Sequence, residues 1–275
     1  MKTFKEITET HNTLMIVDGL NLAFRYKHGK VRDFATDYIR TVQSLQKSYK
    51  ASKVIIACDK GSSSFRKSIY PEYKQNRKDK FDNQTEQEKQ EFEEFFNDFE
   101  QTMELCAEQF EVLRYQGVEA DDIAGYLVSK RKSLGFDNIW LISSDRDWDL
   151  LLSPYVHRFS YVTRKEYSLE NWGEHYDFSH DDYMSIKCLM GDSGDNIIGV
   201  PGVGPKRAQS LIEEYGSVFD IIQAIPLPGK YKYIAAINDS ADLLELNHKL
   251  VDIETFCDEA IGEANIKDIN ERLGL

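Results

Sequence analysis

The sequence predicts an α/β protein built on a mostly parallel sheet flanked by helices. Apolar runs of strand length recur along the chain, and stretches with helical spacing separate them. This alternation is typical of βαβ units, in which helices connect parallel strands. Each apolar run also leads into acidic residues, and open α/β sheets hold their functional sites beyond the carboxyl ends of the strands.

The first two strands are predicted at residues 14–17 and 54–58, and Asp18 and Asp59 follow them directly. We expect Gly19 to Asn21 to form a turn. Apolar side chains then recur at helical spacing from position 34 to position 49, which predicts a right-handed βαβ unit.

A basic segment and an acidic helix follow the second strand. Residues 61–64 (GSSS) are predicted to be a loop, and Pro71 argues against one continuous helix through the basic stretch. The phenylalanines between positions 92 and 110 mark an amphipathic helix. Residues 66–80 carry six basic residues against two acids, whereas residues 82–108 carry ten acids against one lysine.

Two further strands, at residues 112–115 and 138–142, precede the other acids of the first half. A helix is predicted over 119–132, with acids in its first turn, where the helix dipole favours them. Asp149 is expected to be a spectator, because Trp148 and the leucines after it indicate a helix that carries it away. A hairpin over 156–169 is predicted at the edge of the sheet.

Carboxylates at the ends of parallel strands should converge on one edge of the sheet. An isolated aspartate there is more often a turn former or a helix cap, but acids from several segments favour a common site. Such a cluster repels itself unless divalent cations neutralise it, so we expect Mg²⁺ or Mn²⁺. The candidate ligands are Asp18, Asp59, Glu119, Asp121, Asp122, Asp145, Asp147, Asp192 and Asp195.

A glycine-rich segment is a candidate phosphate grip. The expected layout is a helix, a glycine-rich hairpin and a second helix, with Ala208 to Tyr215 in the second helix. Glycines at 199, 202 and 204 would let backbone N–H groups approach a phosphate, and Lys206 and Arg207 follow at a helix start. The alternative is a glycine-rich turn between packed helices. No strand precedes the segment, which excludes a dinucleotide-binding fingerprint.

Composition narrows the class of protein. A net charge of −13 argues at first against nucleic acid, but the basic residues are segregated in blocks. The four cysteines and six histidines form no zinc pattern. No apolar run is long enough for a membrane span and the N-terminus lacks the apolar core of a signal peptide, so we expect a cytoplasmic protein with no membrane partner.

The motifs LMIVDGLN, ACDKG, PEYKQNR, GVEADD, ISSDRDWD and MGDSGDNIIGVPGVGPKR resemble, in this order, the 5′-nuclease family. This family comprises flap endonucleases and the 5′-nuclease domains of bacterial DNA polymerase I, and the pattern resembles in particular the stand-alone bacteriophage T5-type flap endonucleases. The resemblance implies a PIN-like sheet, a helical arch over about 64–100, and a helix-hairpin-helix-type C-terminal region. It also implies a catalytic domain at 1–180, a DNA-binding region at 181–275, and a host-cell cytoplasmic location for a phage-encoded enzyme.

The resemblance also assigns roles. It implies a first metal at Asp18, Asp59, Glu119, Asp121 and Asp122, a second at Asp145, Asp147, Asp192 and Asp195, and a K⁺ at the Gly199–Gly204 hairpin. Lys74 and Arg77 would be catalytic. The DNA-binding set is Arg25, Tyr73 (as a base-stacking ring), Lys78, Lys80, Gly202, Gly204, Lys206 and Arg207.

We therefore expect a monomeric, structure-specific 5′-nuclease with flap endonuclease and 5′-3′ exonuclease activity, acting by two metal ions and leaving 5′-phosphates. Its expected partner is branched or flapped DNA with a 5′ end, RNA-DNA hybrid being a further candidate, with no obligate protein partner. The alternatives are a PIN-like ribonuclease, which would not require the glycine-rich hairpin, and a junction-binding protein that does not cut.

Overall fold

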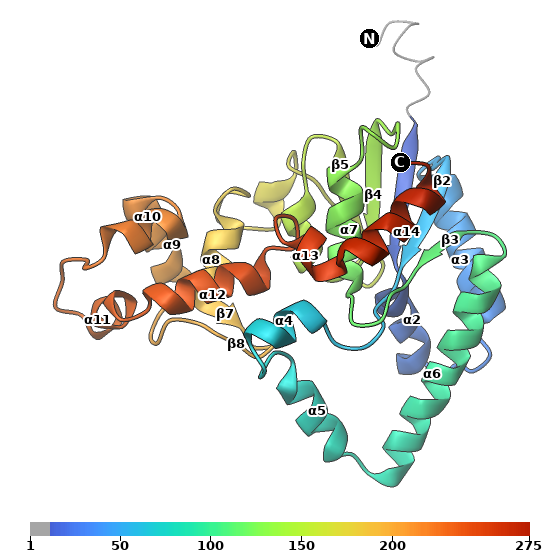
Figure 1. Ribbon diagram of the computed structural model, residues 1–275, viewed down its shortest axis with the longest axis horizontal. Coiled ribbons are helices and arrows are strands. Elements are labelled where there is room, and N and C mark those ends of the chain that lie inside the picture. The colour runs from blue at the N-terminus through green and yellow to red at the C-terminus, as the bar shows by residue number, and fades with distance from the viewer. Residues whose placement is uncertain (1–11) are drawn as a thin grey trace, which may run out of the picture.

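A six-stranded sheet organises the computed structural model, which describes residues 12–275 (Figure 1). Its strand order is β3-β2-β1-β4-β5-β6, with the first five strands parallel and β6 antiparallel at the edge. The strands are β1 (Thr13–Asp18), β2 (Lys53–Ala57), β3 (Glu111–Leu113), β4 (Asn138–Ile142), β5 (Val156–Ser160) and β6 (Lys165–Tyr167). The predicted mostly parallel sheet and its edge hairpin are confirmed.

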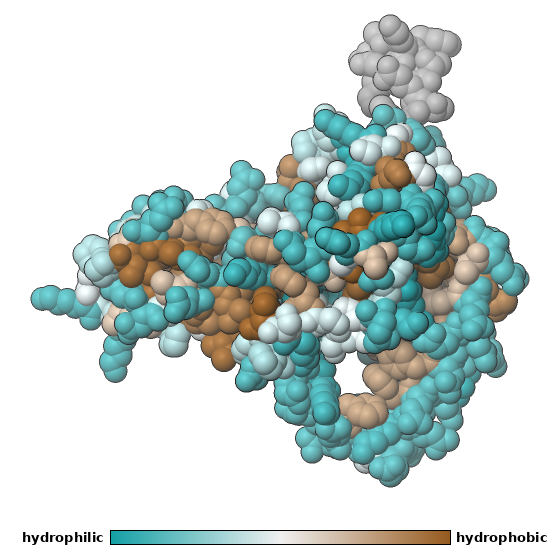
Figure 2. Space-filling model, viewed as in Figure 1, coloured by the Kyte–Doolittle hydropathy of each residue, from teal (hydrophilic) through white to brown (hydrophobic). Residues whose placement is uncertain are grey.

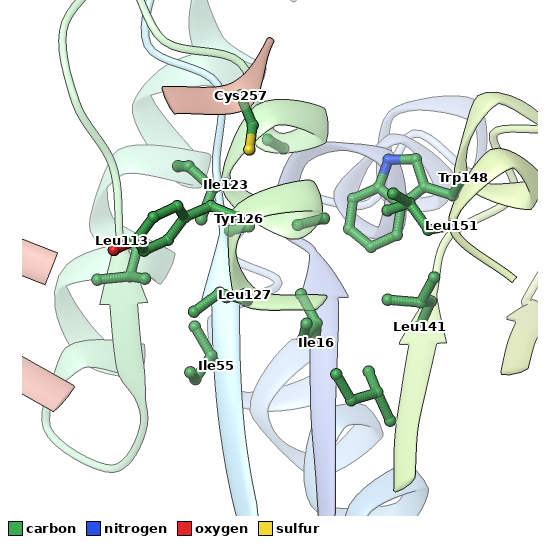
Figure 3. Close-up of a cluster of buried hydrophobic side chains, with 14 of the residues drawn as sticks. Ile16, Ile55, Leu113, Ile123, Tyr126, Leu127, Leu141, Trp148, Leu151 and Cys257 are labelled. Carbon is green, nitrogen blue, oxygen red and sulfur yellow. The ribbon is translucent and has the colours of Figure 1, made fainter. Parts of the chain in front are cut away.

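Alternation along β1 sends side chains to both faces of the sheet. Leu14 and Ile16 join a core with α7 (Ala120–Ser129), α13 (Cys257–Ile261) and α14 (Glu263–Leu273), part of which Figure 3 shows. Met15 and Val17 pack with α2 (Gly19–His28), α3 (Ala35–Ser48) and α6 (Glu86–Ala107) on the other face. Because all four side chains are fully buried, the β1 backbone is held firmly and Asp18 emerges at a fixed point.

Three helices form an arch beside the carboxyl edge of the sheet. The chain passes through α4 (Ser64–Ile69), α5 (Gln75–Asp82) and the long α6, and the break at Pro71 separates α4 from α5 as predicted. A capping box at Thr85 and Glu88 starts α6 at the far tip of the arch. In Figure 2 an opening is visible between this arch and the body of the molecule.

The C-terminal region builds a separate core from α8 (Tyr183–Met190), α9 (Pro205–Tyr215), α10 (Val218–Ala224), α11 (Lys232–Asn238) and α12 (Ala241–Val251). A two-stranded ribbon, β7 (Gly191–Asp192) and β8 (Ile197–Ile198), joins α8 to the glycine-rich segment. Helices α13 and α14 return to pack against α7, so the last part of the chain belongs to the first core. The division at residue 180 stays a prediction.

Two local expectations were wrong. Gly19 to Asn21 form no turn but the first residues of α2, because Asp18 caps that helix by accepting a hydrogen bond from the Asn21 amide. The helix predicted over 119–132 ends at Ser129. Within residues 12–275, no helix combines the length and apolarity that a membrane crossing requires.

Candidate active site

Asp18 and Asp59 stand at the ends of neighbouring strands. The Asp18 carboxylate accepts hydrogen bonds from the Asn21 amide at 3.1 Å and from the Ser143 hydroxyl at 2.7 Å. Asp59 accepts one from the Ala120 amide, at the start of α7, at 2.6 Å. Burial, together with the charge of Asp59, raises the pKa of Asp18 to about 8, so the site favours a proton or a cation there.

Asp121 and Asp145 complete a group of mutually repelling acids. Asp121, in the first turn of α7, accepts a hydrogen bond from the indole nitrogen of Trp148 at 2.6 Å. Its pKa lies well above the usual range because it is buried and because Asp145 and Asp59 carry like charges. Four carboxylates from β1, β2, α7 and the loop after β4 therefore act on one another, as convergence at one edge requires.

A lysine bridges the next two acids, and sequence reasoning missed it. Lys187 on α8 donates to Asp147 and, at 3.1 Å, to Asp192. Burial raises the pKa of Asp147 to about 6 although Lys187 opposes this. Burial would also raise the pKa of Asp192, but Lys187 and the amides of Gly194 and Asp195 together lower it. Lys187 lies five residues before Asp192 and belongs to no recognisable motif. Only the packing of α8 shows that it contacts the acids.

Lys74 bridges a second pair of acids in the same way. Its ammonium nitrogen lies 2.5 Å from a Glu119 oxygen and 3.5 Å from an Asp195 oxygen. Although burial would raise it, the pKa of Glu119 is lowered by Lys74 and by Arg66. Two lysines thus hold pairs of carboxylates that come from different parts of the chain.

The base of the arch is fastened to the loop that carries Asp195. The Lys74 amide donates to the Asp195 carbonyl at 2.9 Å, and the Arg77 guanidinium reaches the Asp195 carboxylate at 2.5 Å. Lys74 adopts a left-handed backbone conformation with φ of 55°, which costs about 1–2 kcal/mol in a residue with a side chain. This turn directs the Lys74 side chain toward the acids, and α5 leads from it into the arch.

Asp122 is paired with an arginine that also reaches Glu119. Its carboxylate forms a two-pronged ion pair with Arg66, at 2.8 and 2.9 Å, and both side chains are almost fully buried. Arg66 also donates to Glu119 at 3.2 Å and to the Leu250 carbonyl at 2.9 Å. The expected metal-ligand role of Asp122 therefore gives way to a positioning role, which ties α4, α7 and α12 together.

The Tyr73 ring offers no face to a base in this structure. The side chain is 2% exposed, and its hydroxyl donates to Glu119 at 3.1 Å and to Asp195 at 3.0 Å. Stacking on a base, the role expected from the sequence, requires exposure that the ring lacks, so Tyr73 supports the acids instead.

The other predicted basic residues lie apart from the acids. Arg25, on α2, donates to the Thr41 hydroxyl at 3.3 Å and stacks on the Tyr161 ring at 4.3 Å. Lys78 and Lys80 are exposed on α5, on the arch. These three side chains are placed to meet a partner outside the carboxylate group.

The glycine-rich segment forms the predicted hairpin between α8 and α9. Gly199 is required by packing, because a side-chain carbon there would lie 2.0 Å from the Met190 carbonyl oxygen. Gly202 has a left-handed φ of 81°, and Gly204 is the N-cap of α9, whose first residue is Pro205. Lys206 and Arg207 follow on the exposed face of α9.

The chemistry of the cluster fits hard divalent cations. Its donors are carboxylate oxygens, which Mg²⁺ and Mn²⁺ prefer. Cys58 does not compete, because its thiol is fully buried against Met103 and burial raises its pKa well above the usual value. Among the described residues no three Asp, Glu, His or Cys side chains are gathered closely enough to hold one ion, and Lys74 and Lys187 hold four of the acids in pairs.

The chain matches two models of one protein family. Residues 13–177 match the 5′-3′ exonuclease N-terminal resolvase-like domain, and residues 178–271 match the 5′-3′ exonuclease C-terminal SAM fold. The flap endonuclease of Escherichia phage T5 is 48% identical over 254 residues, which cover 92% of this chain and 87% of that protein.

Solved structures of the phage enzyme match over nearly the whole chain. A complex of that flap endonuclease with DNA and metal ions, described as pseudo-enzyme–product, superposes with a TM-score of 0.91 at 46% identity. A structure of the phage 5′-exonuclease with bound zinc gives the same TM-score and identity. Both cover 95% of this chain and 98% of their own.

Proposed function

The chain belongs to the 5′-3′ exonuclease family and is a metal-dependent nuclease, and we propose that it cuts flapped or 5′-ended duplex DNA by a two-metal-ion mechanism. The observation that carries this proposal is the convergence of acids from β1, β2, α7, the loop after β4 and the β7–β8 ribbon beside the base of an arch. A junction-binding protein would not need so many unneutralised carboxylates in one place.

We propose that Asp18, Asp59, Glu119 and Asp121 hold one Mg²⁺ and that Asp145, Asp147, Asp192 and Asp195 hold the other, with Mn²⁺ as a substitute. The ions would lower the pKa of an attacking water and stabilise the leaving 3′-oxygen. The phosphate would then stay on the 5′-oxygen of the other product. The Ser143 hydroxyl and the Asn21 backbone amide orient Asp18 by donating hydrogen bonds to its carboxylate. The Trp148 indole nitrogen orients Asp121 in the same way.

Lys74 and Lys187 supply positive charge within the carboxylate cluster. Each ammonium sits between two carboxylates, and a cation that enters the cluster competes for the same oxygens. Once released, Lys74 can turn to the scissile phosphate, and Arg77, which is more exposed, can contact the same strand. Both would stabilise charge that develops on the phosphate.

The hairpin and the arch select the substrate. Lys206, Arg207 and the hairpin backbone would grip the duplex phosphates, with K⁺ as a candidate ligand of the hairpin carbonyls. Lys78 and Lys80 on the arch, and Arg25 on α2, would contact the strand that ends in the 5′ terminus. We propose that the enzyme acts as a monomer, and an RNA strand paired to DNA stays a candidate substrate.

Cleavage of a labelled 5′-flap substrate in Mg²⁺ and in EDTA tests this function. We expect incision near the branch, and this incision should disappear in EDTA. Where the cut leaves a nick without a gap, DNA ligase should seal it, because the product carries a 5′-phosphate. Single-stranded RNA of the same sequence is the control for a ribonuclease. Faster cleavage of the RNA, or incision unaffected by EDTA, would overturn the proposal.

A further inference from the structure

The start of α11 packs an aromatic ring against the duplex-gripping hairpin. The Arg207 guanidinium lies over the Tyr233 ring, with its carbon 4.7 Å from the ring centroid. The same guanidinium donates to the Gly202 carbonyl at 2.5 Å. A side-chain carbon on Gly202 would lie 3.5 Å from Tyr233 and 3.7 Å from Arg207, so these three residues meet at one point.

Tyr233 is itself held from two sides. Its ring packs against the apolar core of the C-terminal region and stacks on Tyr231, with centroids 5.7 Å apart and planes inclined by 16°. Tyr231 is 71% exposed, so the outer face of this stack lies at the surface beside the hairpin. The core side of Tyr233 provides a rigid support, and the hairpin side carries the arginine.

Arg207 has no acidic partner within the described part of the chain, and its guanidinium contacts the Gly202 carbonyl and the Tyr233 ring. Arg207 is exposed, and a ring and a carbonyl orient it instead of a carboxylate. Its charge therefore stays available to an anion, although the protein has a net charge of −13. A guanidinium that is already ordered loses less rotamer freedom when it binds a phosphate.

We infer that Tyr233 is a positioning residue of the duplex grip, which holds Arg207 against the Gly202 carbonyl so that its guanidinium meets the phosphate backbone preordered. The inference rests on the proposed function, because it assigns the phosphate contact to Arg207. Tyr233 makes no phosphate contact of its own in this scheme. A cation–π contact at an exposed site corresponds to about a two- to five-fold change in affinity.

The test measures duplex dissociation constants in Ca²⁺ as a function of salt for four variants and a double variant. Arg207→Ala should weaken binding and lower the salt slope by about one unit. Tyr233→Leu should weaken binding about two- to five-fold with the slope unchanged, because the charge stays. Tyr233→Phe should keep the wild-type affinity, because the ring stays. In the Arg207→Ala background, Tyr233→Leu should weaken binding no further.

A matched control removes a similar stack elsewhere. Arg131 lies over the exposed Tyr155 ring at 4.3 Å, next to the amino end of β5 and away from the hairpin, so Tyr155→Leu should leave duplex affinity unchanged. If Arg207→Ala weakens binding and Tyr233→Leu does not, the positioning role is refuted and the hairpin grip stands. If Arg207→Ala itself has no effect, the proposed grip fails first. Additive losses in the double variant would also refute the inference.

Discussion

Replacing Lys74 by alanine should slow cleavage by about 10²-fold or more while changing duplex affinity little. The Lys74 ammonium contacts Glu119 and Asp195 at the base of the arch and makes no contact with the hairpin residues that we assign to duplex binding. Loss of one preorganised donor to a developing charge typically costs about 2.7–4 kcal/mol of transition-state stabilisation, which corresponds to about 10²–10³-fold in rate.

The same substitution should also change stability without metal. Glu119 would keep Arg66 and Tyr73 as partners but lose the ammonium at 2.5 Å, and its side chain is only 4% exposed. We expect a loss of about 1–3 kcal/mol in the free energy of unfolding, less than for a buried charge left wholly unpaired. Added Mg²⁺ should recover part of it, because the ions neutralise the same carboxylates.

The assay compares single-turnover rates in Mg²⁺ with dissociation constants in Ca²⁺ on one flap substrate. Lys267→Ala is the matched control, because Lys267 is an exposed lysine on α14 to which no contact with DNA or with the acids is assigned. The reasoning is refuted if Lys74→Ala weakens binding as much as it slows cleavage, since the lysine would then be an ordinary phosphate contact. Thermal melts with and without Mg²⁺ report the stability change.

Three further predictions follow from the same site. Asp145→Asn should abolish nearly all cleavage yet retain DNA binding, and a wild-type rate in saturating Mg²⁺ would contradict this. Lys206→Ala should weaken duplex binding about equally for all sequences and lower the salt slope by about one unit; a changed sequence preference with unchanged slope would exclude a phosphate contact. Because the metal-free pKa of Asp18 is about 8, ions must displace protons below that pH, so Mn²⁺ affinity measured by calorimetry should rise from pH 6 to pH 8 with proton release. A pH-independent affinity would show that Asp18 is already ionised.

The strand ends were predictable because their signal is local. An apolar run followed by an aspartate specifies both the strand and the position of the acid, and Asp18, Asp59 and Asp145 lie where that pattern puts them. The Gly199–Gly204 hairpin was predictable for a similar reason, since Pro205 marks the first turn of the next helix.

Roles that depend on helix rotation or on distant partners were not predictable. Asp121 and Asp122 are neighbours in sequence, but about 100° of helix rotation separates them, so one faces Trp148 and the other Arg66. Lys187 had no motif to mark it. The resemblance implied a base-stacking role for Tyr73, and only the fold shows that its side chain is buried and that its hydroxyl donates to Glu119 and Asp195.

Anomalous diffraction from crystals soaked in Mn²⁺ would locate the proposed ions directly. We expect two peaks about 3.5–4 Å apart, one against Asp18, Asp59, Glu119 and Asp121 and one against Asp145, Asp147, Asp192 and Asp195. The ammonium groups of Lys74 and Lys187 should have left the acids that they bridge without metal. A cluster without peaks, with both lysines still in place at saturating Mn²⁺, would contradict the account.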